Sequence, residues 1–383
     1  MDKIKVLSIF GTRPEATKMA PLVKALEQCK HIHSVVCVTA QHRQQLDQVL
    51  DVFNISPDYD LNIMIEKQDL AHITTAALNG LMKIINESSP HLILVHGDTT
   101  TTLSASLAAY YSQVKLGHVE AGLRTYDKFA PFPEEVNRKI VSCIADLNFS
   151  PTSCAKSNLL KENIQADNIF ITGNTAIDAI DSLIKPDYRF KYSLLNNIDF
   201  TNKRIIAVTA HRRENYGKPL ENICKSLARL VEDFDDTEIV YPVHLSPWVR
   251  DIAYKILGNN SKIHLTEPVD VEDLLNVISR SYIVMTDSGG IQEEAPHLNK
   301  PVLVLRNVTE RPEGLNTGCL ALAGTDEASV YDIAAKLLAD EFEYQKMSSA
   351  QNPFGDGKAS ARIVNAILYH FGLLDKKPED FKL

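Results

Sequence analysis

Acidic side chains follow short apolar runs at several points in this sequence. Asp98 comes just after the run at 92–95, Glu120 lies in the segment GHVEAG, and Glu134 lies in the loop FAPFPEE. A carboxyl group at the end of a buried strand, facing a cleft, can act as a general acid or a general base. These three carboxylic acids are therefore candidates for moving protons to and from a bound substrate.

Two other interpretations of this cluster remain open. His96 and His118, with Asp98 and Glu120, are acceptable ligand types for a two-metal hydrolase. The sequence has no H-E-x-x-H or similar ligand spacing, so we expect no metal site. The second interpretation is structural, because buried polar side chains are commonly satisfied by backbone groups. Three acids at successive strand ends favour catalysis over that alternative.

Two turns that contain glycine could bind an anion. The first, FGTRPEATKM, has Gly11 in a turn, Pro14 at the start of a helix, and the cations Arg13 and Lys18. Backbone amides at a helix N-terminus attract anions, and the two cations strengthen that attraction. The alternative is a structural turn that carries two solvated charges.

The second turn, DSGG from Asp287, follows the apolar run YIVMT. A Ser-Gly-Gly turn lets backbone amides approach a diphosphate closely at the start of a helix. Glu294 lies about one turn further on, where an acid can accept hydrogen bonds from ribose hydroxyls. Arg306 and Arg311 are expected near the same edge, and His211 stands beside two arginines. An ordinary glycine turn is the alternative, but together these residues predict a nucleotide diphosphate bound between two domains.

These residues can act together only in a fold that brings the ends of several strands close to one another. The apolar runs predict such a fold. Continuous rather than alternating apolar runs are typical of strands buried on both faces of a parallel sheet. Helical spacing separates them, most clearly at 103–111, 223–234 and 363–371. Strands that alternate with helices indicate doubly wound α/β domains. The runs begin at Lys5, Ser34, Leu92, Ile169, Arg204, Glu238, Tyr282 and Pro301.

The length of 383 residues indicates more than one such domain. The polar and aromatic segment at 185–203 lacks periodicity and precedes a fresh strand. We predict an N-terminal Rossmann-like domain at 1–172 and a C-terminal Rossmann-like domain at 173–365 that binds the nucleotide diphosphate. A terminal helix at about 366–380 is expected to pack back onto the first domain.

The composition excludes several classes of protein. The formal charge of −9 argues against a general nucleic-acid or anionic-membrane binder. Six scattered cysteines without a C-x-x-C pair indicate free thiols rather than a disulfide framework. The apolar stretch at the N-terminus is too short for a signal peptide, and no run reaches about 18 apolar residues. We therefore expect a cytoplasmic protein with no membrane partner.

In these segments the chain resembles the bacterial non-hydrolysing UDP-N-acetylglucosamine 2-epimerases, which are similar to two-domain glycosyltransferases of the GT-B type. The resemblance implies an α/β fold of two Rossmann-like domains that face each other across a cleft. It also implies reversible conversion of UDP-GlcNAc to UDP-ManNAc for cell-surface polysaccharides, without a cofactor. The matching segments span Phe10 to Ser360: FGTRPEATKMAPL, VTAQHRQQLDQVL, LVHGDTTTTL, GHVEAGLRT, PEEVNR, ITGNTAIDA, TAHRREN, YPVHLSP, TDSGGIQEEAP, TERPEG and NPFGDGKAS.

The resemblance implies a role for individual residues. The catalytic positions are Lys18, Asp98, Glu120, Glu134 and His211, and the substrate-binding positions are Arg13, Ser288, Gly289, Gly290, Glu294 and Arg311. A second UDP-GlcNAc activates many bacterial members, at positions matched here by Gln41, Gln44, Arg212 and His244. Lys67 stands where related enzymes can have arginine, and lysine lacks the bidentate fork of a guanidinium. Similar enzymes are commonly homodimers.

The implied reaction must remove a hydrogen that no neighbouring carbonyl acidifies. Transient oxidation would need nicotinamide, and the G-x-G-x-x-G fingerprint is missing from the sequence. The other route expels UDP from the anomeric carbon, forms 2-acetamidoglucal and adds UDP back. Which acid serves which face of the sugar is open. A hydrolysing epimerase, a glycosyltransferase that uses the same nucleotide sugar and a non-catalytic sensor are the competing functions.

Overall fold

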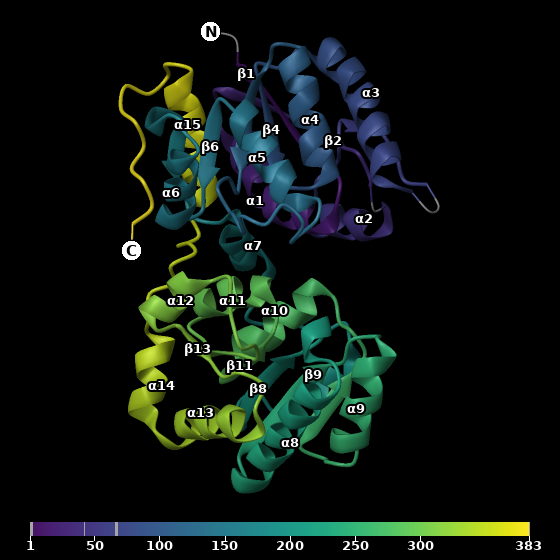
Figure 1. Ribbon diagram of the computed structural model, residues 1–383, viewed down its shortest axis with the longest axis vertical. Helices are drawn as coiled ribbons and strands as arrows, with labels where there is room; N and C mark the ends of the chain where they lie inside the picture. Colours follow the sequence, from purple (N-terminus) through teal and green to yellow (C-terminus); the bar gives the residue numbers. More distant parts are fainter. Residues whose placement is uncertain (1–2, 42, 66–67, 383) are drawn as a thin grey trace. The chain divides into compact units, whose positions relative to one another are not determined.

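The chain folds into two compact units, each built around one parallel sheet (Figure 1). The computed structural model describes residues 3–41, 43–65 and 68–382. One unit runs to Ala179 and also takes in Phe354–Lys382, and the other is Ile180–Pro353. The predicted fold class, two doubly wound α/β domains, is confirmed.

The first unit contains a seven-stranded sheet in the order β3-β2-β1-β4-β5-β6-β7. Helices α3, α4 and α5 pack together, and α1 packs against α2 and α15. Its elements are β1 (Ile4–Phe10), α1 (Arg13–Gln28), β2 (Ile32–Val38), α2 (Arg43–Val52), β3 (Tyr59–Asp60), α3 (Leu70–Ser88), β4 (Leu92–His96), α4 (Thr100–Tyr111), β5 (Lys115–Val119), α5 (Glu134–Ile144), β6 (Leu147–Ser150), α6 (Ser153–Lys161), η1 (Ala166–Asn168), β7 (Ile169–Ile171), the start of α7 (Thr175–Leu183) and α15 (Ala359–His370).

The second unit contains a six-stranded parallel sheet in the order β10-β9-β8-β11-β12-β13. Its elements are the end of α7, η2 (Ser193–Asn197), β8 (Arg204–Thr209), η3 (Arg213–Asn215), α8 (Lys218–Asp233), β9 (Thr237–Pro242), α9 (Pro247–Leu257), β10 (Ile263–Thr266), α10 (Val271–Arg280), β11 (Ile283–Thr286), α11 (Gly289–Glu294), η4 (Ala295–Leu298), β12 (Val302–Val304), α12 (Pro312–Thr317), β13 (Leu320–Leu322), α13 (Glu327–Ala339) and α14 (Glu341–Ser348).

Continuous apolar strands bury both faces of the second sheet. Ile206 and Val208 of β8 pack in one cluster with α8, α9 and α13, whereas Ile205 and Ala207 pack in another with α10 and α11. Side chains alternate across a strand, so each sheet face receives every second residue. Leu227 of α8 is one of six buried apolar side chains of that helix, and burial of a leucine side chain contributes about 1.5–3 kcal/mol.

Each sheet has a topological switch point, where successive strands begin to be added on the opposite side of the first strand. In the first unit this point lies between β1 and β4, and in the second it lies between β8 and β11. Ligands of open α/β sheets bind outside the carboxyl ends of the strands at such points. The turns after these four strands are therefore where the predicted site residues should be examined.

Helix α4 forms where helical spacing at 103–111 predicts it, but the apolar residues of that spacing, Leu103, Leu107, Tyr110 and Tyr111, are not the ones it buries. Tyr110 and Tyr111 are exposed, whereas Ala105, Ala108 and the hydroxyl residue Ser104 are buried. Helices α3 and α5 both pack against α4, and small side chains on its buried side permit that close packing. The apolar residues at 363–371 include Ile363 and Ile367, which are buried in α15, but this helix spans Ala359–His370, so the terminal helix expected at about 366–380 was placed too late in the chain.

The division into units differs from the sequence boundaries of 172/173 and about 366. The first unit extends into α7 and includes the chain from Phe354 onward. Three contacts explain this: the Asn174 amide donates to the Phe354 carbonyl at 2.7 Å, and the Asp178 carboxylate accepts from the Ala359 and Ser360 amides. Asp178 thus serves the first backbone amides of α15 and fixes it to the first unit.

The described helices include none that is both long and apolar enough to cross a membrane. All six cysteines are free, as the sequence predicts, and Cys37, Cys224 and Cys319 are buried.

Candidate active site

In the first unit, Glu15 connects the loop after β1 to the loop after β4. Its Oε2 accepts hydrogen bonds from the amides of Gly11 (3.1 Å) and Thr12 (2.8 Å). Its Oε1 accepts from the hydroxyls of Thr99 (2.7 Å) and Thr102 (3.1 Å). Burial raises the pKa of Glu15, and these hydrogen bonds oppose that rise. The Glu15 carboxylate therefore fixes the two turns that flank the switch point between β1 and β4.

Gly11 is required by the close approach of two threonines. A Cβ atom there would lie 2.0 Å from Thr39 Oγ1 and 2.7 Å from Thr101 Oγ1. The Thr101 hydroxyl in turn donates to Gln41 Oε1 at 3.1 Å, so Gln41 lies beside this turn. Gln44 is exposed on α2. Lys67 lies outside the described residues.

Glu120 lies in a network of polar groups after β5. The Lys18 ammonium donates to Glu120 Oε1 at 2.5 Å, and the Asn174 side-chain amide donates to the same atom at 3.3 Å. His96 Nε2 lies 3.5 Å from Glu120 Oε2. Burial would raise the pKa of Glu120, but Lys18 and its neighbours outweigh burial and hold that pKa well below its usual value. Glu120 is therefore ionised at neutral pH.

The two histidines beside the acids are buried and uncharged. Burial lowers the pKa of His96 to about 4 and that of His118 to about 3. His118 Nε2 donates to the Gly97 carbonyl at 2.7 Å, which positions the residue before Asp98. His96 Nε2 is buried without a hydrogen-bond partner among the described residues.

Asp98 differs from Glu120 in its electrostatic surroundings. Burial raises the pKa of Asp98, the Glu120 charge raises it further, and the Arg138 guanidinium opposes both. Arg138 of α5 forms an ion pair with Asp98 Oδ2, and the neighbouring Asn137 donates to the Asp98 carbonyl at 2.8 Å. One carboxyl group is thus held ionised while a second, close by, is shifted toward its protonated form.

The two glutamates that begin α5 have different surroundings. Glu135 is fully buried, and its carboxylate accepts the backbone amides of Thr125 and Tyr126 at 3.0 Å each. Glu134 Oε2 is buried without a hydrogen-bond partner among the described residues. Glu135 therefore holds the loop at Thr125 and Tyr126, whereas Glu134 Oε2 can still accept a hydrogen bond.

In the second unit, Asp287 gathers the loop after β8. Its Oδ2 accepts from the amides of His211 and Arg212 at 2.8 Å each and from the Asn215 side chain at 3.0 Å. The His211 ring stacks on the His244 ring with centroids 5.4 Å apart and planes at 13°. Burial lowers the pKa of His211, and the Asp287 charge opposes that effect.

The Ser-Gly-Gly turn opens α11 as predicted. The Ser288 amide donates to the Thr286 hydroxyl at 2.9 Å, and Gly290 is exposed. A Cβ atom on Gly289 would lie 3.4 Å from the Arg311 guanidinium carbon, which places that cation at the turn. Arg311 is held there by Glu293, with Nε 2.8 Å from Oε1.

Arg306 and Glu294 occupy different environments near this edge. Arg306 is only 5% exposed and donates to Glu214 and Glu310, so it joins two loops. Glu294 is half-buried at the end of α11, with Oε1 3.5 Å from where a Cβ atom of Gly290 would lie.

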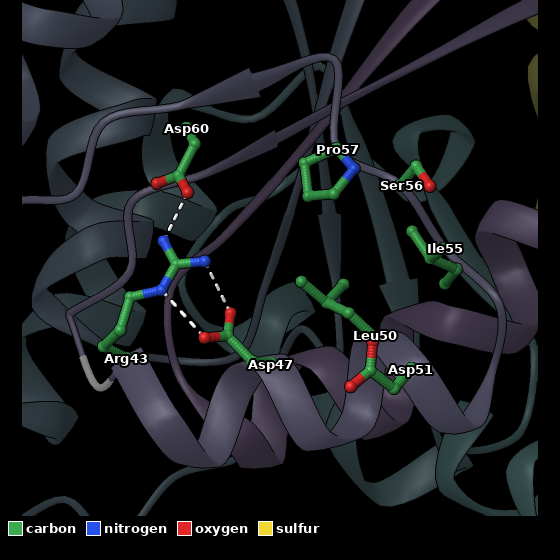
Figure 2. Close-up of a pocket in the computed structure, with 8 residues that line it drawn as sticks. All are labelled: Arg43, Asp47, Leu50, Asp51, Ile55, Ser56, Pro57 and Asp60. Atoms are coloured by element: carbon green, nitrogen blue, oxygen red, sulfur yellow. Dashed lines mark hydrogen bonds and ion pairs between the residues drawn. The ribbon is translucent and has the colours of Figure 1, made fainter.

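A separate pocket of about 370 Å³ lies in the first unit, and none of the predicted site residues lines it. Figure 2 shows the Arg43 guanidinium between the carboxylates of Asp47 and Asp60. Leu50 and Ile55 supply part of its apolar wall. The ion pairs connect α2, which carries Gln44, to β3.

The structure brings most of the predicted residues together within each unit. Lys18, Asp98 and Glu120 share one network, whereas Arg13 is exposed at the start of α1. His211, Arg212 and His244 form a second group with the strand-end residue Asp287. Within the ranges 3–41, 43–65 and 68–382, no three His, Cys, Asp or Glu side chains are arranged to hold a metal ion.

Sequence reasoning missed Glu15, Arg138 and Asp287 as site residues. Glu15 carries a recognisable signal, because Thr12 and Glu15 have the spacing of a capping box. Asp287 directly follows a buried strand, the same signal that identified Asp98. Arg138 has no such local signal, since its role depends on a partner from another loop.

Comparison with known proteins identifies the family. A family model described as UDP-N-acetylglucosamine 2-epimerase matches residues 24–368. The UDP-N-acetylglucosamine 2-epimerase of Bacillus subtilis is 55% identical over 381 residues, covering 100% of this chain and 99% of its own length. A crystal structure of a UDP-N-acetylglucosamine 2-epimerase has a TM-score of 0.94 at 53% identity and covers 100% of both chains.

A further solved structure carries a ligand. The UDP-GlcNAc 2-epimerase of Neisseria meningitidis, solved bound to UDP-GlcNAc, has a TM-score of 0.83 at 44% identity and covers 95% of this chain and 100% of its own. With more than half of its residues matched and full-length relatives above 50% identity, the chain belongs to the UDP-N-acetylglucosamine 2-epimerase family.

Proposed function

We propose that this protein interconverts UDP-GlcNAc and UDP-ManNAc by eliminating UDP and adding it back, without hydrolysis. The family and the UDP-GlcNAc bound in the Neisseria enzyme support the substrate. The elimination route is supported by chemistry, because loss of UDP makes the anomeric carbon positive and so acidifies the hydrogen at the neighbouring carbon. The product of elimination is 2-acetamidoglucal.

The observation that carries the mechanism is that two buried acids of the first unit are paired with different cations, Glu120 with Lys18 and Asp98 with Arg138. Glu120, which is held ionised by Lys18, suits stabilisation of the positive charge that develops at the anomeric carbon. Asp98, whose pKa burial raises, suits transfer of a proton to or from the substrate. Glu134, whose buried Oε2 has no hydrogen-bond partner in the part of the chain that the structure describes, is the candidate for proton transfer on the other face of the sugar.

The second unit supplies groups that suit a departing diphosphate. The Gly289 and Gly290 amides at the start of α11 and the Arg311 guanidinium beside them are hydrogen-bond donors fixed before the reaction begins. His211 adds a third donor when it is protonated. The first unit carries two further cations in α1, Arg13 and Lys18.

Turnover of UDP-GlcNAc in deuterated water tests this proposal. We expect NMR to show UDP-ManNAc with deuterium at carbon 2, no accumulating free sugar and no need for an acceptor. Retention of the original hydrogen would contradict elimination. Free ManNAc with UDP would indicate a hydrolysing enzyme, a required acceptor would indicate a glycosyltransferase, and tight binding without turnover would indicate a sensor.

We also propose that a second UDP-GlcNAc activates the enzyme. Gln41 lies beside the Gly11 turn, which precedes the helix that carries Lys18, and His244 stacks on the proposed catalytic His211. The proposal predicts that the ManNAc-to-GlcNAc direction shows a lag that added UDP-GlcNAc removes. A His244→Ala variant should lengthen the lag, and progress curves without any lag would contradict the proposal.

A further inference from the structure

Asp287 uses one of its two carboxylate oxygens to organise the loop after β8. It is fully buried, and Oδ2 alone accepts three donors, the amides of His211 and Arg212 and the side chain of Asn215. Asp287 follows β11, and the loop that it holds follows the neighbouring strand β8. The carboxylate therefore spans the switch point of the second sheet.

The other carboxylate oxygen of Asp287, Oδ1, lies beside the imidazole ring of His211. Asp287 Oδ1 is buried, has no hydrogen-bond partner among the described residues, and lies 3.5 Å from His211 Nδ1. A buried acceptor is rarely left without a donor. The His211 ring is limited on one side by its parallel stack on His244. The His211 Nδ1 atom therefore faces Asp287 Oδ1, an acceptor with no donor among the described residues.

We propose that Asp287 is a positioning residue that keeps the proton of neutral His211 on Nδ1. In that tautomer Nε2 is the unprotonated ring nitrogen, free to take a proton and then donate it in a hydrogen bond to an anion. Asp287 also favours the imidazolium form, which carries protons on both nitrogens. The consequence for turnover rests on the proposed function, in which protonated His211 stabilises the departing diphosphate.

The charged groups that face His211 act in opposite directions. Burial, His244 and Arg212 disfavour the imidazolium form, whereas the Asp287 charge favours it. In an Asp287→Asn variant the amide oxygen can keep the backbone contacts, but the amide nitrogen then faces Nδ1 as a donor. The proton of neutral His211 should therefore move to Nε2, and the imidazolium should become less stable.

The test begins with the wild-type protein. At about pH 8, above the ordinary pKa of histidine, ¹⁵N NMR of the His211 ring, assigned by its loss in His211→Gln, should show a protonated Nδ1 and an unprotonated Nε2. Asp287→Asn should show the opposite tautomer. A wild-type ring protonated on Nε2 would overturn the proposal, even if the variant failed to fold.

Kinetics supply the second readout. Asp287→Asn should lower kcat at least about tenfold while changing the KM for UDP-GlcNAc less than about threefold. Activity that needs the imidazolium is lost as pH rises through the His211 pKa, so the basic limb of the profile should move to lower pH. An unmoved basic limb, or a loss confined to KM, would contradict the positioning role.

Tyr241→Phe is the matched control. The Tyr241 hydroxyl donates to the Ala210 carbonyl at 2.8 Å, so its removal loosens the same loop without touching the imidazole. It should leave the tautomer and the basic limb unchanged, and a shift equal to that of Asp287→Asn would overturn the proposal. The tautomer measurement needs no turnover, so absence of epimerisation would refute the proposed function while leaving this result to stand separately.

Discussion

Asp98 and Glu120 show how one functional group acquires two protonation behaviours from its neighbours. Both carboxyl groups are mostly buried, and burial favours the protonated form of each. Each acid has its own cation, Lys18 at Glu120 and Arg138 at Asp98, but the positive charges outweigh burial at Glu120 and only partly offset it at Asp98. Sequence spacing identified the two acids, but not this assignment, since Arg138 and Asn174 reach them only through the fold.

Arg138→Met tests the assignment of Asp98. Removing the cation should raise the pKa of Asp98 further, because Arg138 is the largest influence that lowers it. The limb of the pH–rate profile caused by Asp98 should then move to higher pH. Arg138→Lys keeps the charge and is the control, for which we expect a smaller shift. An identical profile in wild type and Arg138→Met would show that Asp98 does not set either limb.

His96 should make the first unit sensitive to acid. Its pKa is about 4 in the folded protein, below the ordinary 6.5, so the unfolded chain binds more protons below about pH 6.5. The stability contributed by the neutral, buried ring is complete above pH 6.5 and is lost as pH falls toward 4. At about 1.4 kcal/mol per pH unit, this amounts to about 2 kcal/mol between pH 7 and pH 5.

Hydrogen-exchange protection of β4 and β5 measures this loss locally. His96→Gln should lose less protection than wild type on the same change of pH, whereas the exposed control His31→Gln should match wild type. Equal losses in all three proteins would contradict the account of His96.

At the scale of elements, the turns after β1, β4, β8 and β11 do most to position the site. The apolar runs predicted the strands that end in these turns, because buried parallel strands have a simple pattern. Two short strands were not predicted: β10 has only two apolar residues, and β13, although apolar, is only three residues long. The buried face of α4 was mispredicted because small residues that pack closely give no apolar stripe.

Glu15 tests the connection between two of these turns. Glu15→Ala leaves the Gly11 and Thr12 amides without their acceptor and should lower the free energy of unfolding by about 2–3 kcal/mol. It should also lower kcat, because the loop that leads to Asp98 loses its anchor at Thr99. Thermal unfolding and steady-state kinetics measure the two effects.

Two control variants allow the effect of Glu15→Ala to be interpreted. Glu15→Gln keeps an acceptor for the two amides and should lie within about 1 kcal/mol of wild type. Glu27→Ala removes a more exposed glutamate from the same helix and should change stability by less than about 0.5 kcal/mol. A Glu15→Ala protein as stable as Glu27→Ala would show that the turns do not depend on this carboxylate.

At the scale of the whole molecule, alternation of strands and helices predicted two doubly wound units. The predicted boundaries differ by several residues, because the division depends on contacts far apart in sequence. Asp178 holds the start of α15 from a position about 180 residues earlier, and no local pattern announces such a pair. The role proposed for each unit in the reaction depends on the loops that lie next to its switch point.

Cleavage of the anomeric carbon–oxygen bond is the central claim, and positional isotope exchange tests it most directly. UDP-GlcNAc carrying ¹⁸O in the bridge between the sugar and the β-phosphorus is incubated with the enzyme and followed by ³¹P NMR. If UDP departs and returns, the label should spread into the non-bridging positions of the β-phosphate while UDP-ManNAc forms. Epimerisation through many turnovers with all ¹⁸O still in the bridge would contradict the account.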